Sequence, residues 1–164
     1  MEDKKFGIDF EPIKLCGCRF QFPTKFSAST LTNNRVPDLC KGKSLGGGID
    51  ILALHKDRLS VIELKDEGTE NVKYVMRQAI VYAVFLNKLF KECPIWKEIL
   101  GCQNIKGIDA VICMPEPSDR NKKAIPENGT SITYCDGSEN AKINLNYIYY
   151  NDKIEIIKSS YQNQ

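Results

Sequence analysis

Residues Gly46–Lys65 read GGGIDILALHKDRLSVIELK, and this stretch decides the fold of the chain. Ile49–His55 and Leu59–Lys65 are rich in Ile, Leu and Val, and a short polar turn separates them. This pattern predicts a β-hairpin. Three ionisable residues nevertheless stand among the apolar ones, where such residues are rare unless they are paired or bind something.

The three residues are Asp50, Glu63 and Lys65, and the predicted hairpin register brings them together. With the turn centred between Lys56 and Asp57, Asp50 stands directly opposite Glu63, and cross-strand Cβ atoms lie about 4.5–5.5 Å apart. Two like charges at that separation repel, so a divalent cation is expected to compensate them. Lys65 is two residues beyond Glu63 and therefore on the same face of the strand.

Glycines line the rim of the predicted hairpin beside the lysine. In the predicted register Lys65 faces Gly48, one of the triplet Gly46–Gly48. Because glycine has no side chain, a substrate backbone is expected to approach closely there. A metal would lower the pKa of a water molecule and neutralise charge on a phosphoryl oxygen, and the lysine would orient that water or stabilise developing charge.

A long, largely buried helix is predicted after the hairpin, at Asn71–Glu92, with Gln78 and Tyr82 one turn apart on one face. A buried strand is predicted next, at Lys106–Pro115. The Asp strand, the Glu-Leu-Lys triplet and the QxxxY helix together resemble the PD-(D/E)XK nuclease superfamily, in particular its RecB-like and NucS-like branch. Gly46–Leu86 carries the resemblance, about a quarter of the chain.

The resemblance implies an α/β fold with a restriction-endonuclease-like core, in which helices flank a mixed β-sheet. It implies that Mg²⁺ (or Mn²⁺) is bound by two side chains and one backbone carbonyl: Asp50, Glu63 and Leu64. It further implies a set of catalytic and supporting side chains: Asp50, Glu63, Lys65, Gln78 and Tyr82. In this set Lys65 is the catalytic lysine, and the last two support the metal, the water or a DNA phosphate.

One departure from the family pattern lies upstream of the hairpin. Many members carry a further Glu on a helix before the Asp strand. Glu11 is the only sensible counterpart here, and Pro12 beside it argues against a helix. The missing Glu argues against a second metal site more than against the first one.

The resemblance implies a metal-dependent nuclease that hydrolyses DNA phosphodiester bonds in restriction, repair or defence. Because one small domain has one hairpin site, cutting both strands would need a homodimer or two events. A partner protein that supplies target recognition is also expected, because no recognition domain is recognisable. The alternative is a nuclease-fold module that binds DNA or docks within a larger complex, with little or no catalytic activity.

Length and composition bound the other properties. The 164 residues suit one domain, with its core at about 20–115 and a hairpin extension at about 131–158. The longest apolar run, Ala79–Leu86, is too short to cross a membrane, and the charged N-terminus does not resemble a signal peptide. Seven cysteines, an odd number, favour reduced thiols. A cytoplasmic protein without membrane contact is expected.

Charge gives a weaker indication. The net charge of +2 does not by itself indicate nucleic acid. Between Lys14 and Lys43, however, six basic residues accompany a single acidic one, Asp38. Both interpretations stay open: a solvated loop surface, or a patch that faces phosphates.

Other signals are weaker still. Gly42–Ser44 resembles the end of a phosphate-binding loop, but Pro37 stands where that motif requires a glycine. A cysteine group near the N-terminus lacks the spacing of zinc or iron–sulfur sites: Cys16, Cys18 and Cys40.

Two further signals concern rings. His55, the only histidine, is expected to be an exposed turn residue rather than a catalytic base. Three tyrosines of the C-terminal segment are candidates for stacking on bases: Tyr147, Tyr149 and Tyr150. Packing within a sheet is the favoured interpretation for them.

Overall fold

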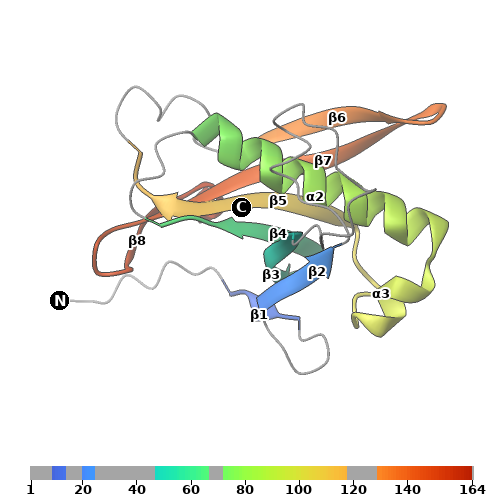
Figure 1. Ribbon diagram of the computed structural model, residues 1–164, viewed down its shortest axis with the longest axis horizontal. Helices are drawn as coiled ribbons and strands as arrows, with labels where there is room; N and C mark the ends of the chain where they lie inside the picture. Colours follow the sequence, from blue (N-terminus) through green and yellow to red (C-terminus); the bar gives the residue numbers. More distant parts are fainter. Residues whose placement is uncertain (1–8, 14–19, 25–46, 67–71, 118–128, 164) are drawn as a thin grey trace, which may run out of the picture.

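The computed structural model describes residues 9–13, 20–24, 47–66, 72–117 and 129–163. Their strands form one curled, mixed β-sheet, and a long helix lies across one face of it (Figure 1). The strands are β1 (Glu11–Pro12), β2 (Phe20–Thr24), β3 (Gly47–His55), β4 (Arg58–Leu64), β5 (Gly107–Pro115), β6 (Thr130–Asp136), β7 (Glu139–Tyr150) and β8 (Ile156–Ser159). The helices are α2 (Val72–Glu92), α3 (Ile95–Ile99) and the 3₁₀ turn η1 (Ser160–Asn163).

β3 and β4 form the predicted hairpin. Their antiparallel ladder runs from His55 opposite Arg58 to Ile51 opposite Ile62, which is the predicted register. Two turn residues, Lys56 and Asp57, connect the strands as expected.

The glycine rim differs from the prediction. β3 begins at Gly47 rather than at Ile49, because Gly47 and Gly48 pair with Thr24 and Pro23 of β2. Backbone pairing therefore covers one side of these two glycines.

α2 connects two parallel strands. β5 pairs in parallel with both β4 and β7, so the carboxyl ends of these three strands meet at one edge of the sheet. α2 leads from β4 to β5 and packs against β4, β5 and β7, so its first turns lie near that edge (Figure 1). The predicted helix and the strand after it are confirmed, although Asn71 itself lies outside the described residues.

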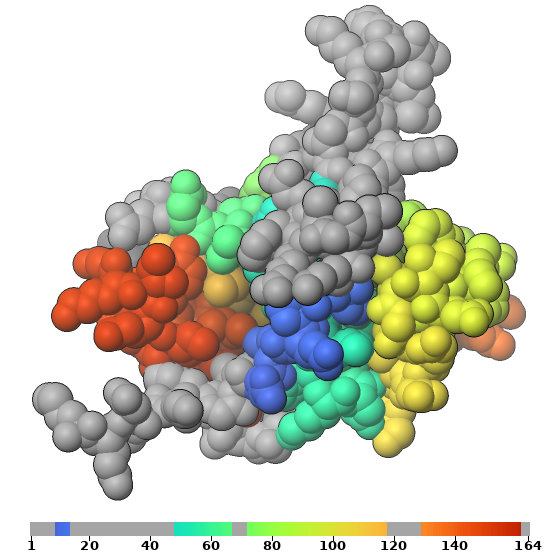
Figure 2. All heavy atoms as spheres, turned by 90° about the horizontal axis from the view of Figure 1, so that it is seen from below, coloured from blue at the N-terminus to red at the C-terminus, as the bar shows by residue number. Residues whose placement is uncertain are grey.

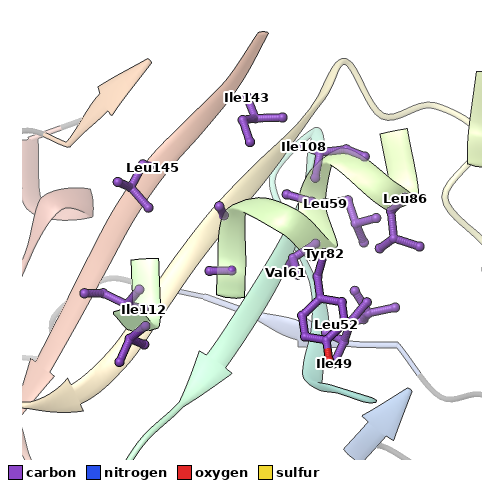
Figure 3. Packing of buried hydrophobic residues seen from close by; sticks show 14 of the residues in the cluster. Ile49, Leu52, Leu59, Val61, Tyr82, Leu86, Ile108, Ile112, Ile143 and Leu145 are labelled. Carbon is purple, nitrogen blue, oxygen red and sulfur yellow. The ribbon is translucent and has the colours of Figure 1, made fainter. Parts of the chain in front are cut away.

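The core lies on both faces of the sheet. The larger cluster, between the sheet and α2, includes Leu52, Val61, Leu86, Ile112 and Leu145 (Figure 3). The smaller cluster, on the opposite face, comprises Ala53, Ile62, Val111, Ile148 and Tyr161. In the described residues, η1 and β8 contribute to this second face in place of a second long helix. Figure 2 shows the blue residues around β1 against the turquoise β3–β4 hairpin, in agreement with the pairing of β1 with β3.

The C-terminal segment contains more strand than predicted. β6 and β7 form a hairpin around Gly137 and Ser138, in addition to the hairpin that was predicted in this segment. β7 also pairs with β8, as the predicted second hairpin requires, and with β5. The segment is therefore part of the central sheet.

Some predictions fall on residues outside the described ones. These are the basic residues between Lys14 and Lys43, the Gly42–Ser44 motif and the N-terminal cysteine group. The cysteines that the structure does describe are all free: Cys93, Cys102, Cys113 and Cys135. Within the described part of the chain, no helix has the length and apolarity needed to span a bilayer.

Candidate functional site

Near Asp50 the two strands of the hairpin stop pairing with each other and pair only with other strands. The β3–β4 ladder ends at the Ile51–Ile62 pair, one step before Asp50 and Glu63. Beyond it β3 continues along β2, while β4 continues along β5 as far as Leu64. Asp50 bridges the arms, because its Oδ2 accepts a hydrogen bond of 2.8 Å from the Leu64 amide.

Glu63 is a buried carboxylate, and only one of its oxygens is bonded by a described residue. Glu63 is only 4% exposed, and Lys65 Nζ lies 2.5 Å from its Oε1 atom. The other oxygen, Oε2, is buried without a hydrogen-bond partner among the described residues. Burial raises the pKa of Glu63, the hydrogen bond from Lys65 partly offsets this, and the charge of Asp50 raises the pKa further. The predicted Asp50–Glu63–Lys65 grouping is thus brought together.

Gln78 and Tyr82 are both buried on the sheet side of α2. Gln78 Oε1 lacks a hydrogen-bond partner within the described part of the chain, like the Glu63 oxygen. The Tyr82 ring points toward Ile49 and Leu52 of β3, the strand that carries Asp50 (Figure 3). Gln78 lies one turn closer than Tyr82 to the start of α2.

The backbone of Lys65 is bonded on both sides. Its amide donates to the carbonyl of Cys113 at 2.9 Å, and its carbonyl accepts a hydrogen bond from the Tyr150 hydroxyl. The sequence singled out Tyr150 only as a candidate for stacking on bases, and not as a residue that contacts Lys65. No local signal identifies it, because the contact joins residues 85 positions apart.

The other two tyrosines pack, as favoured. Tyr147 and Tyr149 are buried in the larger core cluster, and their rings stack with centroids 4.5 Å apart. The Tyr149 hydroxyl has no hydrogen-bond partner among the described residues, and burial raises its pKa to about 12.

Glu11 does not join the site. It lies in β1, is exposed, and pairs with Leu54, four positions from Asp50 along β3, or about 13 Å. The absence of a helix at Glu11 agrees with the prediction. No group of three or more His, Cys, Asp or Glu side chains is placed for metal binding within the described ranges.

The remaining donor set suits a hard cation. It consists of the Asp50 and Glu63 carboxylates and the Leu64 carbonyl, all oxygen. Mg²⁺ is commonly held by one or two carboxylates and completes its shell with water and substrate. Glu63 Oε2, which is buried and has no hydrogen-bond partner in the described part of the chain, is the observation that fits such an ion.

The expectation that His55 is an exposed turn residue is wrong. The strand extends through His55, which is only 8% exposed and lies with its Nδ1 atom 2.9 Å from the Asp9 carbonyl oxygen. Phe10 and Tyr161, from opposite ends of the chain, place their rings 5.2 Å and 5.0 Å from its ring. Because both segments cover the hairpin end, the histidine is buried.

A second buried carboxylate, Asp109, was not predicted from the sequence. Asp109 of β5 is 1% exposed; Arg58 Nε donates to its Oδ1 at 2.6 Å, and the Tyr161 hydroxyl lies 3.4 Å from its Oδ2. Burial raises its pKa, and Arg58 opposes the rise. The available signal was an Asp inside the apolar run Gly107–Pro115, the same signal that marked Asp50.

No family model, curated protein or solved structure matches this chain.

Proposed function

We propose that the protein is a divalent-cation-dependent nuclease of the PD-(D/E)XK type that hydrolyses DNA phosphodiester bonds. The observation that carries the proposal is the buried Glu63 carboxylate. Lys65 bonds one of its oxygens, no described residue bonds the other, and Asp50 accepts a hydrogen bond from the amide of the following residue, Leu64. The order of elements supports a restriction-endonuclease-like core, since the hairpin is followed by the QxxxY helix and a parallel strand.

Asp50, Glu63 and the Leu64 carbonyl would hold Mg²⁺ or Mn²⁺, which take the same kind of oxygen ligand. When bound, the ion would lower the pKa of a water molecule and neutralise charge on a phosphate oxygen. Burial makes such a site effective, because charge interactions are stronger away from bulk water.

Lys65 and Gln78 would act on the water and the phosphate. A lysine ammonium has three N–H donors, so Lys65 keeps donors for a phosphate oxygen after bonding Glu63. Gln78 Oε1 would accept a hydrogen bond from the attacking water. As the water oxygen bonds to phosphorus, one P–O ester bond breaks. The water gives up one proton to the solvent, and the leaving oxygen takes up one proton from the solvent. Tyr82 would support β3 behind Asp50.

A cleavage assay tests the proposal. The protein is incubated with supercoiled, linear and single-stranded DNA and with RNA, with millimolar Mg²⁺ or with a chelator. We expect metal-dependent cutting of DNA, with Asp50→Ala and Lys65→Ala each reducing kcat by about 10³-fold.

Matched controls come from charged pairs at the surface. Asp57→Ala removes an exposed carboxylate that pairs with Lys106. Lys91→Ala removes an exposed ammonium group that pairs with Asp136 and Glu139. Both should cut like the unmodified protein. Cutting that survives Asp50→Ala and Lys65→Ala would place the activity elsewhere and overturn the proposal.

A second candidate is a nuclease-fold module that binds DNA or docks in a larger complex without cutting. It is favoured by the position of Glu11, which leaves the site with two acidic side chains among the described residues. Fluorescence anisotropy with labelled duplex DNA separates the two functions. Binding without cleavage in both Mg²⁺ and Mn²⁺ would favour the module.

We also propose how a single site would act on a duplex. One hairpin site per chain would require a homodimer, or a partner protein that recognises the target. Light scattering with and without duplex DNA measures the assembly.

We further propose a cytoplasmic location, which the free thiols of the described cysteines support.

A further inference from the structure

Lys65 stands where the ladder between β4 and β5 should continue. In a parallel ladder, a residue bonds through its N–H to the residue before its partner and through its C=O to the residue after it. Leu64 pairs with Cys113, so the next pair in register is Lys65 with Met114. The Lys65 amide accordingly donates to the carbonyl of Cys113. Its carbonyl should then accept a hydrogen bond from the amide of residue 115.

Residue 115 is a proline, which has no amide hydrogen. The ladder bond to the Lys65 carbonyl therefore cannot form from the backbone. Pro115 pairs with Tyr150 in the adjoining β5–β7 ladder, and the Tyr150 hydroxyl donates to that same carbonyl. A side chain thus takes the place of the missing peptide donor.

We propose that Tyr150 is a positioning residue for Lys65, because its hydroxyl replaces the donor that Pro115 lacks and fixes the lysine backbone. The inference rests on the proposed nuclease function for its effect on catalysis. β4 ends at Leu64, so Lys65 is the first residue after the strand. The two backbone bonds hold it there, with Nζ 2.5 Å from Glu63 Oε1.

The cost of losing this contact follows from geometry. Without the hydroxyl, the Lys65 backbone would keep only the amide bond to β5. A misplacement of about 1 Å at a reacting group costs up to about 100-fold in rate. Tyr150→Phe, which removes only the hydroxyl, should lower kcat by about tenfold and leave KM unchanged.

The decisive test restores the donor from the other side. Pro115→Ala supplies a peptide N–H in register with the Lys65 carbonyl. We expect this substitution alone to leave kcat unchanged, and the double variant Pro115→Ala/Tyr150→Phe to recover kcat to within about threefold of the unmodified protein. A packing role for the tyrosine would not be rescued in this way.

The matched control is Tyr134→Phe. The Tyr134 hydroxyl accepts a hydrogen bond of 2.5 Å from Asn87 Nδ2, between β6 and α2, so it is also a half-buried hydroxyl that joins two elements. Its loss should leave kcat unchanged.

Amide hydrogen exchange of Lys65, followed by NMR, gives a readout independent of cleavage. Exchange should speed up in Tyr150→Phe and slow again in the double variant. Equal kcat and exchange in Tyr150→Phe and the unmodified protein, or losses that Pro115→Ala does not rescue, overturn the inference. If the exchange pattern holds but the unmodified protein cuts no nucleic acid, the backbone contact stands and the nuclease proposal falls.

Discussion

Glu63 and Asp109 lie on neighbouring strands, both are buried, and both have a raised pKa, yet their surroundings differ. Both oxygens of Asp109 have partners, Arg58 and Tyr161. Glu63 has Lys65 on one oxygen and, among the described residues, nothing on the other. Buried acceptors in folded proteins are nearly always satisfied. The completed network is therefore structural, and the incomplete one is expected to bind a ligand.

The largest expected effect separates activity from stability at Glu63. Glu63→Gln should reduce kcat by about 10³-fold, equivalent to about 4 kcal/mol of transition-state stabilisation. The free energy of unfolding at neutral pH should rise by about 1 kcal/mol, because a poorly compensated buried charge is removed. Cleavage assays and urea unfolding measure the two. A loss of stability as large as the loss of activity would contradict the division between the two carboxylates.

The opposite result is expected at Asp109. Asp109→Ala should lower the free energy of unfolding by about 3 kcal/mol, because it breaks a buried ion pair. This is the low end of the range for such pairs, since Arg58 is 27% exposed and its charge can still be solvated. The kcat of the folded fraction should not change. If the variant is too unstable to purify, Asp109→Asn gives a milder form of the same test. A variant that folds well but has lost its activity would show that Asp109 belongs to the site.

A smaller effect is expected from the cation. For a site with millimolar affinity, about 10 mM Mg²⁺ should stabilise the native state by about 1.4 kcal/mol. The stabilisation should vanish in Asp50→Ala and persist in Asp57→Ala. Thermal unfolding with and without Mg²⁺ measures it. Equal stabilisation of both variants would indicate binding elsewhere.

The smallest effect concerns pH. For a carboxyl whose pKa is raised on folding, the native state binds more protons than the unfolded state, so stability falls as pH rises from its ordinary pKa through the raised one. The ordinary values are 4.5 for Glu63 and 3.8 for Asp109. In Glu63→Gln the fall of the free energy of unfolding above about pH 4.5 should be shallower, because only the contribution of Asp109 remains. Parallel pH profiles for the two proteins would contradict this.

The parts of the fold that depend on local patterns were predictable. The hairpin register, α2 and β5 follow from alternation, helical periodicity and an apolar run. The β6–β7 hairpin was missed, although Gly137-Ser138 between two runs of strand residues is a recognised hairpin signal. The parallel pairing of β7 with β5 has no local signature, because it joins segments that are distant in the sequence.

The site divides in the same way. Asp50, Glu63 and Lys65 were identified from one hairpin, since their placement depends on a single turn. Asp109 shows the same isolated acid in an apolar strand, and only its partners distinguish it. The contact of Tyr150 with Lys65 depends on three aligned strands and a proline, which no short window of sequence contains.

The late position of β7 in the chain has a consequence for synthesis. Lys65 contacts Tyr150, 85 residues later, and Ser60 contacts Tyr161, 101 residues later. At a synthesis rate of about 5–20 residues per second, roughly 4–17 seconds pass between the synthesis of Lys65 and that of Tyr150. During that interval the hairpin carries its carboxylates and lysine while the strand that steadies the lysine does not yet exist. We therefore expect the proposed nuclease activity to appear in a nascent chain only after β7 has emerged and folded onto β5.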